Sequence, residues 1–184
     1  MTRVRLRPAH TAQALATIYP QPHDHRRWRD HHVRVDATIA LARGVDNVGS
    51  VADLSCGNGT IAKAVGAPRT VLGDYAPGYP ICGPIEQTIH GIDPVDLYIC
   101  SETIEHLDDP DLALKLIRGK ARHLVLTTPV DNWGDANIEH YWAWSKTDVE
   151  AMLTAAGWRI EVTNVLDMRP APWSPYAFGM WVCA

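Results

Sequence analysis

The chain of 184 residues lacks the features that would place it in a membrane or secreted class. No apolar run approaches the ~20 residues that a membrane-spanning helix needs, which argues against an integral membrane protein. The basic start, Arg3 to Arg7, has no apolar stretch behind it, so we expect no secretory signal. The four cysteines show no paired spacing, which argues against a disulfide framework or a cysteine zinc site and favours the cytoplasm. With 46% hydrophobic residues, the length suits one domain.

Charge is distributed unevenly along the chain, although the net charge is only −4. Residues 1–43 carry eight Arg and three Asp, whereas residues 44–184 carry nine basic and 18 acidic side chains. Five of the nine histidines also lie in the first segment. A basic arm on an acidic body can attract a phosphorylated or nucleic-acid partner. The alternative is a surface helix whose arginines pair with acids of the body.

Strands and helices alternate from residue 48 onward, after a predicted short helix over 8–19 and a longer one over about 25–43. Alternation of this kind favours a parallel sheet covered on both faces, and the last two strands favour an antiparallel edge. Ser145 and Asp148 are spaced as a capping box at the start of the last helix. The predicted strands are 48–54, 70–73, 97–100, 123–127, 159–166 and 176–183, and the predicted helices are 60–65, 107–120 and the stretch after Ser145.

The sharpest local signal is the passage from Val51 to Thr60, where a buried strand ends in a small-residue turn and enters a helix. Gly57 and Gly59 permit positive φ and close approach of a ligand to the backbone. We expect the helix start to offer unpaired N–H groups to an anionic ligand group. The passage also satisfies the loose dinucleotide fingerprint G-x-G-x-x-A, so a nicotinamide cofactor is one candidate ligand.

Several ordered motifs resemble those of class I S-adenosylmethionine (SAM)-dependent methyltransferases. The glycine passage resembles their first motif, with Ser55 in place of the first glycine. The segments 96–110, 123–129 and 155–158 resemble the fourth strand with its turn, the fifth strand, and the helix end before the sixth. The resemblance covers about residues 48–184.

This resemblance implies a Rossmann-like, doubly wound α/β fold with a mostly parallel sheet and an antiparallel C-terminal edge strand. It divides the chain into a SAM-binding methyltransferase domain over 48–184 and a basic, His-rich helical arm over 1–47 that covers the site. The fold is abbreviated after the second strand, because the residues between Asp74 and Asp96 include four prolines and leave little room for a helix. We expect a loop there.

The resemblance also implies SAM as the cofactor and S-adenosylhomocysteine (SAH) as the product. Asp74 ends the second strand, where the family's acid binds the ribose hydroxyls. Pro84 stands where an acid commonly meets the adenine amino group, so Ile85 would pack on the adenine and Glu86 would substitute for the acid. The complete set of expected cofactor-binding residues is Asp53, Ser55, Cys56, Gly57, Asn58, Gly59, Asp74, Tyr75, Ile85, Glu86, Ser101 and Glu102.

A candidate metal site lies in the segment Glu102-x-x-Glu105-His106, together with the downstream His140. Two carboxylates and two imidazoles suit Mg²⁺ or a similar divalent ion. The segment resembles two methyltransferase groups, the ubiquinone-biosynthesis O-methyltransferases (methyltransferase type 11) and the small-RNA 2′-O-methyltransferases. In the RNA group, the residues that correspond to Glu102, Glu105, His106 and His140 hold a metal. In many metal-free relatives the histidine only caps a helix or lines the pocket, and both interpretations stay open here.

Four functions compete on this sequence. The first is a SAM-dependent methyltransferase acting on oxygen, nitrogen or carbon of a small molecule. The others are a metal-assisted RNA or DNA methyltransferase, a SAM-binding protein without transferase activity, and a nicotinamide-dependent oxidoreductase. The candidate catalytic groups are His106, His140 and Tyr19, since a base is needed only where the acceptor must lose a proton. No membrane partner is expected, and the sequence predicts no oligomeric state.

Overall fold

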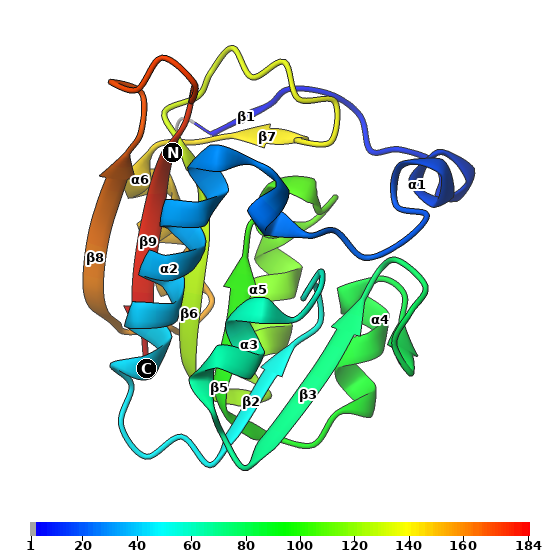
Figure 1. Ribbon diagram of the computed structural model, residues 1–184, viewed down its shortest axis with the longest axis vertical. Helices are drawn as coiled ribbons and strands as arrows, with labels where there is room; N and C mark the ends of the chain where they lie inside the picture. Colours follow the sequence, from blue (N-terminus) through cyan, green and yellow to red (C-terminus); the bar gives the residue numbers. More distant parts are fainter. Residues whose placement is uncertain (1–2) are drawn as a thin grey trace.

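The computed structural model describes residues 3–184, so only residues 1 and 2 of the predicted arm lie outside it. Its centre is a seven-stranded sheet in the order β4-β3-β2-β5-β6-β9-β8 (Figure 1). Strands β4, β3, β2, β5 and β6 are parallel, whereas β9 pairs antiparallel with both β6 and β8. This order confirms the expected doubly wound α/β fold with an antiparallel C-terminal edge. The strands are β2 Ser50–Asp53, β3 Arg69–Asp74, β4 Ile81–Cys82, β5 Val95–Ser101, β6 Ala121–Val130, β8 Ile160–Asp167 and β9 Ala177–Cys183.

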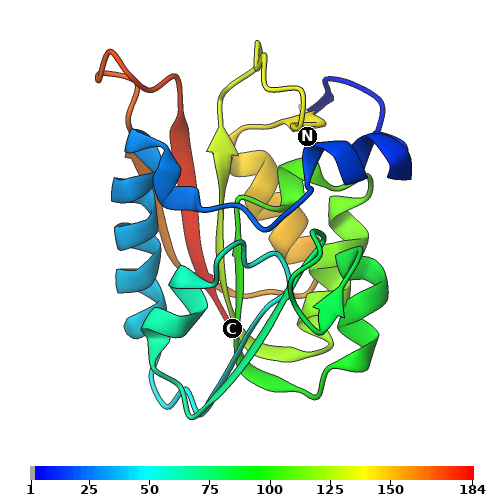
Figure 2. The same ribbon diagram turned by 45° about the vertical axis from the view of Figure 1, so that its right-hand side comes forward.

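Helices cover both faces of this sheet (Figures 1 and 2). Strand β5 is buried on both of its faces. Leu97 and Ile99 pack toward α2 and α3, whereas Tyr98 and Cys100 pack toward α4, α5 and α6. A strand that is buried on both faces has an apolar run instead of an alternating pattern. The helices are α2 Arg29–Arg43, α3 Thr60–Val65, α4 Ile85–Thr88, α5 Pro110–Arg118 and α6 Lys146–Ala155.

The N-terminal segment contains more structure than the sequence indicated. Helix α1 (Ala12–Ile18) forms within the predicted range, and Thr11 caps it. The predicted helix over 25–43 is divided, because Asp24 caps the short 3₁₀ turn η1 (His25–Arg27) and Trp28 is extended before α2 begins. Strand β1 (Val4–Arg5) pairs antiparallel with β7 (Trp142–Ala143), a pairing too short for the sequence pattern to indicate.

The proline-rich segment after β3 retains two elements, so the prediction of a simple loop is wrong. Strand β4 pairs in parallel with β3, and α4 begins directly after Pro84. Proline is compatible with the start of a helix because its ring fixes φ and the first N–H groups have no helical partner. A second 3₁₀ turn, η2 (Ile89–Gly91), follows α4.

The capping box of α6 is confirmed, and it gives a testable stability prediction. The Ser145 hydroxyl accepts a hydrogen bond from the Asp148 N–H, and the Asp148 carboxylate accepts one from the Ser145 N–H. We expect Ser145→Ala to lower the free energy of unfolding by about 1 kcal/mol, measured by urea denaturation. Thr154→Ala, at an exposed position of the same helix, is the control and is expected to change it by less than about 0.5 kcal/mol.

Among residues 3–184, no helix combines the length and the apolar character required to span a bilayer.

Candidate functional site

A cavity of about 400 Å³ opens where β2, β3 and β5 end. Ligands of open α/β sheets bind at this edge, beyond the carboxyl ends of the strands. The chain between α1 and α2 passes over the same end of the sheet (Figures 1 and 2). Nine expected site residues line the cavity: Tyr19, Ser55, Gly57, Asp74, Tyr75, Ile85, Glu86, Glu102 and His106.

One end of the cavity contains the residues expected to hold an adenosine. Ile85 is 5% exposed at the start of α4 and lines the wall together with Pro84 and Glu86. Asp74 ends β3, and its carboxylate accepts hydrogen bonds from the N–H groups of Gly57 (2.7 Å) and Ala76 (2.9 Å). Burial raises the pKa of Asp74, whereas these two hydrogen bonds lower it.

The glycine loop differs from the expectation in one respect, because its N–H groups already have partners. The Gly57 N–H donates to Asp74, and the Asn58 N–H donates to the carbonyl oxygen of His23 at 3.0 Å. The N–H groups of Ser55, Cys56, Gly59 and Thr60 are also bonded within the chain. The prediction of free N–H groups for an anion is therefore wrong for residues 55–60. The N-terminal arm uses one of these donors itself.

Several expected cofactor residues do not line this cavity. Asp53 is 3% exposed and accepts hydrogen bonds from the Ser55 N–H and hydroxyl. Burial raises the pKa of Asp53 to about 7. The expected cofactor residues that do not line the cavity are Asp53, Cys56, Asn58, Gly59 and Ser101.

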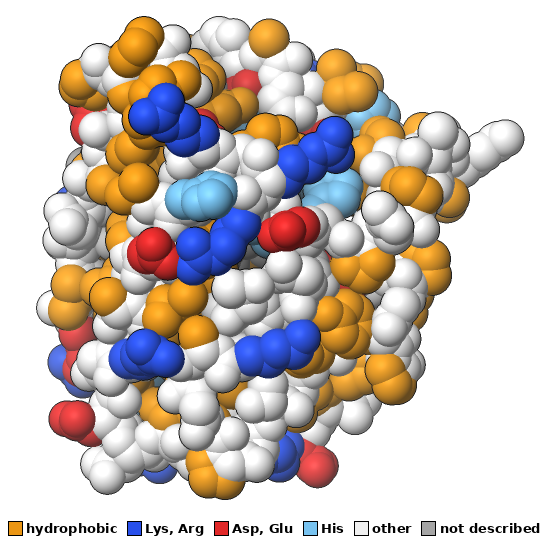
Figure 3. Space-filling model, viewed as in Figure 1, with side chains coloured by type: hydrophobic (Ala, Val, Ile, Leu, Met, Phe, Trp, Pro, Cys, Tyr) orange, Lys and Arg blue, Asp and Glu red, His pale blue; other side chains and the backbone are white. Residues whose placement is uncertain are grey.

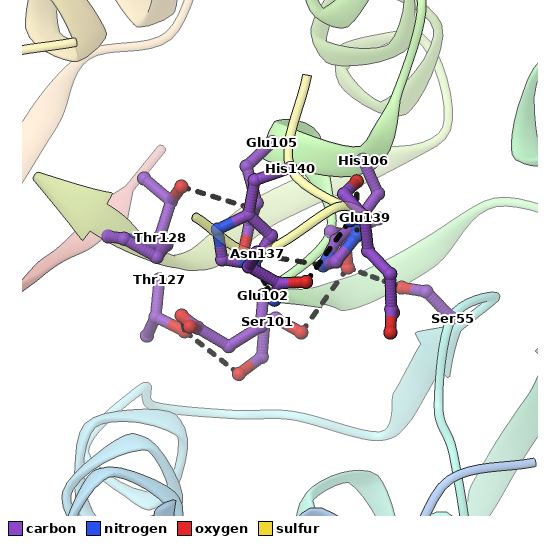
Figure 4. Close-up of polar contacts among 12 residues, drawn as sticks. Ser55, Ser101, Glu102, Glu105, His106, Thr127, Thr128, Asn137, Glu139 and His140 are labelled. Atoms are coloured by element: carbon purple, nitrogen blue, oxygen red, sulfur yellow. Dashed lines mark hydrogen bonds and ion pairs between the residues drawn. The ribbon is translucent and has the colours of Figure 1, made fainter. Parts of the chain in front are cut away.

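The candidate metal ligands meet beside this cavity. One ligand atom from each of Glu105, His106 and His140 lies within 4.8 Å of the other two (Figure 4). Glu105 is 1% exposed, and its Oε1 has no hydrogen-bond partner among the described residues. Glu102 lies outside this group, because its carboxylate accepts a hydrogen bond from the Thr127 hydroxyl at 3.1 Å. Glu102 also has a φ of 53°, a strained backbone conformation of the kind that clusters at functional sites.

Outer contacts orient the two imidazoles. His140 Nδ1 lies 2.6 Å from a carboxylate oxygen of Asp135, and His106 Nδ1 lies 3.0 Å from the carbonyl oxygen of Glu139. Both Nδ1 atoms thus have an acceptor. Metal-ligating histidines usually donate their second ring N–H to a carboxylate or carbonyl in this way. His106 Nε2 faces Glu105 Oε1 at 3.7 Å, whereas His140 Nε2 lies 3.0 Å from the Asn137 amide nitrogen, which a metal would have to displace.

The electrostatics of the cluster also suit a cation. Burial and the nearby Glu102 raise the pKa of Glu105 to about 8. Burial lowers the pKa of His106 well below its usual value, so this imidazole is neutral near pH 7. Burial also disfavours charge on His140, but the hydrogen bond to Asp135 and the field of Glu105 outweigh it and raise the pKa. A bound cation would compensate the negative charge of the buried carboxylates of Glu102 and Glu105, because few positive side chains of the protein lie close to them.

Tyr19 is the third expected catalytic group, and it too lies at the cluster. Its hydroxyl is 3.2 Å from His106 Nδ1, and its ring lies edge-on to that of His106. Burial and the carboxylate of Glu139 raise the pKa of Tyr19, so the phenol stays protonated. The phenol therefore suits positioning or hydrogen-bond donation better than proton abstraction.

The aromatic residues near His140 and in the C-terminal loop have different environments. Tyr141 lines the cavity, and its hydroxyl accepts a hydrogen bond from the His10 N–H. Trp144 is 1% exposed in the core and donates to the carbonyl oxygen of Pro129. Trp173 lies at the surface beneath the Arg29 guanidinium.

Sequence reasoning missed a buried group beside the glycine loop. Arg34 of α2 is fully buried and donates to the Ser101 hydroxyl at 2.5 Å. His25 and His31 both contact its guanidinium through Nδ1. The sequence shows the arm histidines only as a high local histidine content. Arg34 gives no signal of its own, because its burial depends on how α2 packs.

The arginines of the arm are engaged within the chain. Arg3 and Arg5 form ion pairs with Asp111 and Asp108 of the acidic body. Arg7 donates to the carbonyl oxygen of Asp135. On the face viewed in Figure 3, basic and acidic side chains are interspersed. The remaining arm arginines contact Asp36 (Arg26), aromatic rings (Arg27, Arg29), Ser101 (Arg34) and the carbonyl oxygen of Ala64 (Arg43).

Comparison with known proteins places this geometry in a fold class. No protein-family model and no curated protein matches the sequence, whereas solved structures do match. The 1,6-didemethyltoxoflavin-N1-methyltransferase of Burkholderia thailandensis, solved with bound S-adenosylhomocysteine, aligns over 98% of this chain and 93% of its own, with a TM-score of 0.64 and 13% identity. The small RNA methyltransferase HEN1 aligns over 98% of this chain and 26% of its own, with a TM-score of 0.63 and 14% identity.

The chain therefore has the fold of class I SAM-dependent methyltransferases, as the sequence motifs predicted. A third match shows why the activity must be argued separately. The cyclase SpnF aligns over 96% of this chain and 97% of its own, with a TM-score of 0.63 and 11% identity. One fold serves different reactions, so the function of this chain depends on its own site.

Proposed function

We propose that this protein is a methyltransferase that moves a methyl group from SAM to an oxygen, nitrogen or carbon atom of a small molecule. The main support is that one cavity contains both a set of residues suited to bind the cofactor and a set suited to contact a reacting acceptor. Asp74 and Ile85 lie at the end suited to an adenosine, and His106 and Tyr19 lie at the end suited to a reacting acceptor. SAM supplies an activated methyl group, so the protein mainly has to align acceptor and donor.

The cavity residues divide this task among themselves. The carboxylate of Asp74 would exchange its present N–H partners for ribose hydroxyls, and Ile85 would pack on the adenine. Tyr19, Leu15 and Tyr141 give the acceptor end a largely apolar wall. We extend the proposal to residues 3–47 as the arm that covers this site, because Tyr19 and several arm neighbours form part of the wall.

We also propose that Glu105, His106 and His140 hold a divalent cation of the Mg²⁺ or Mn²⁺ class. The unpartnered Glu105 oxygen and the outward hydrogen bonds of both imidazoles support this fit. A metal held there would lower the pKa of a hydroxyl group that coordinates it. The chain's own residues then hold the ligand set rigid, with Asp135 fixing the His140 ring.

The acceptor proposed is a small molecule, not RNA or DNA. A nucleic-acid groove needs arginines that are free to contact phosphates. Here Arg3 and Arg5 are paired with acids of the body, and Arg34 is buried. The cytoplasmic location expected from the cysteines stays a prediction; all four are free thiols in the structure.

Calorimetry with SAH and NAD, each titrated into the same protein, tests the cofactor class. We expect SAH to bind and NAD to bind far more weakly. Asp74→Ala should weaken SAH binding by roughly tenfold or more, because hydrogen bonds to a charged group are lost. Tight NAD binding without SAH binding would refute the proposal.

The matched control is Asp93→Ala, an acid that lies outside the cavity on the loop before β5. It should leave SAH affinity unchanged. Equal losses in the two variants would mean that Asp74 does not contact the ligand. Methyl transfer itself is then checked with radiolabelled SAM and a panel of small hydroxyl- and amine-containing acceptors, against a nucleic-acid substrate.

A further inference from the structure

The occupied N–H groups of the glycine loop raise the question of what would receive the carboxylate of SAM. The amino-acid tail of SAM carries one carboxylate and one ammonium group. With adenosine at Asp74 and Ile85 and the acceptor at His106, the tail faces the wall between them. That wall includes Ser55, Gly57 and His25. An anion placed there needs a donor from outside the loop backbone.

His25 of η1 lies directly against the loop at this point. The position that a Cβ atom on Gly57 would occupy is 3.0 Å from His25 Nε2 and 2.9 Å from its Cδ2. The Nε2 edge of the ring therefore faces Gly57 and the cavity. Within residues 3–184, this nitrogen makes no hydrogen bond.

The opposite edge of the same ring determines where its hydrogen sits. His25 Nδ1 is 3.3 Å from an Nη atom of Arg34. A guanidinium has donors only, so Nδ1 must accept, and a neutral ring then carries its hydrogen on Nε2. Burial first, and the positive charge of Arg34 next, lower the pKa of His25 to about 3. The ring is thus neutral at physiological pH and presents an N–H donor to the cavity.

Arg34 is well suited to fix this arrangement. Its side chain is fully buried, it donates to the Ser101 hydroxyl, and His31 Nδ1 lies 2.9 Å from the same Nη atom. Among the described residues, no carboxylate oxygen lies within 4.0 Å of its nitrogen atoms, and its Nε has no partner. Glu102, Glu105 and Asp30 stabilise its charge from farther away. The field of this cation favours an anion on the far side of His25.

We propose that His25 binds the carboxylate of the SAM tail through its Nε2–H, and that Arg34 is the positioning residue that fixes this tautomer. The inference rests on the proposed function, because it needs SAM or SAH in the cavity. It assigns to the arm a direct part in cofactor binding, in place of the glycine-loop N–H donors, which are bonded within the chain and one of which the arm itself occupies.

A pair of ligands that differ only in the carboxylate tests the contact. Calorimetry is done with SAH and with decarboxylated SAH, which retains the adenosine, the sulfur and the amine. We expect His25→Ala to weaken SAH binding roughly tenfold to a hundredfold, since the contact is a hydrogen bond to a charged group. The affinity for decarboxylated SAH should not change.

Two conservative variants sharpen the assignment. The amide nitrogen of Gln reaches the position of Nε2, whereas that of Asn reaches only the position of Nδ1. His25→Gln is therefore expected to retain most of the SAH affinity, and His25→Asn to lose it like His25→Ala. Equal loss of both ligands in His25→Ala would show a merely structural role and overturn the proposal.

The role of Arg34 has its own readout, the ¹⁵N chemical shifts of the imidazole nitrogens. In ¹⁵N-histidine-labelled protein we expect the His25 signals, identified by their loss in His25→Gln, to report protonated Nε2. A protonated Nδ1 would overturn the proposal without any mutation of Arg34. Failure of the wild type to bind SAH and also 5′-methylthioadenosine, which lacks the whole tail, would instead refute the proposed function.

Discussion

Replacing Gly57 by alanine is expected to separate the arm from the glycine loop and to abolish most cofactor binding. The alanine Cβ would lie 2.4 Å from the carbonyl oxygen of His23, and φ at this position is +53°. Backbone cannot move away as a flexible side chain does, so the hydrogen bond from the Asn58 N–H to His23 must break. We expect the free energy of unfolding to fall by about 2–4 kcal/mol, from strain and overpacking together.

SAH affinity should fall by roughly tenfold or more in the same variant, because His23 and His25 leave the cavity wall together. Isothermal calorimetry measures the affinity, and trypsin cleavage after Arg26 and Arg27 reports the released arm. The control is Gly66→Ala, which has a φ of +76° but no atom within 4 Å of the added Cβ. It should cost about 1 kcal/mol of stability and leave SAH affinity intact. Similar effects in both variants would show that strain alone matters.

Replacing Glu105 by glutamine is expected to remove divalent-cation binding at the cluster. The change keeps the shape of the side chain and its contact with the Thr128 hydroxyl, but it removes the negative charge and one strong ligand. We expect Mn²⁺ affinity, measured by electron paramagnetic resonance of the free ion, to fall by roughly a hundredfold. Activity on the acceptor, once identified, should fall with it and should also be lost in wild-type protein treated with EDTA.

Glu139→Gln is the matched control, because Glu139 is adjacent to His140 in sequence but lies outside the cluster. Its Mn²⁺ affinity should stay close to that of the wild type. Glu102→Gln then decides whether the fourth expected ligand takes part, which the separation of its carboxylate in this structure argues against. Unchanged Mn²⁺ binding in Glu105→Gln, or full activity in EDTA, would contradict the metal proposal.

Much of the fold was predictable because its signals are local. Helix α3 occupies Thr60–Val65 as predicted, since a strand, a glycine turn and a helix start follow one another within a few residues. Ser145 and Asp148 likewise identify the start of α6 by their spacing. The predictions that failed involve competing local effects. Asp24, for example, caps the start of a short 3₁₀ turn, and the extended Trp28 ends that turn before α2 begins.

The sequence predicted which residues form the candidate site, but it did not predict which contacts they make with one another. Glu105 and His106 are neighbours in sequence, so their proximity follows from the motif, and His140 joins them because its loop returns past the same strand ends. Glu102 comes from the same motif, but it lies apart because its left-handed backbone turns the carboxylate toward Thr127. A spacing rule does not encode that difference.

The sequence determined the α/β class of the fold, and its basic, His-rich N-terminal segment was visible as a change in composition. The tertiary structure decided which residues that arm contacts. Packing of α2 on the sheet buries Arg34, and the turn at His23 takes an N–H group of the glycine loop. Such contacts join residues that are far apart in sequence, and they depend on the shape of the assembled core. Neither composition nor periodicity carries that information.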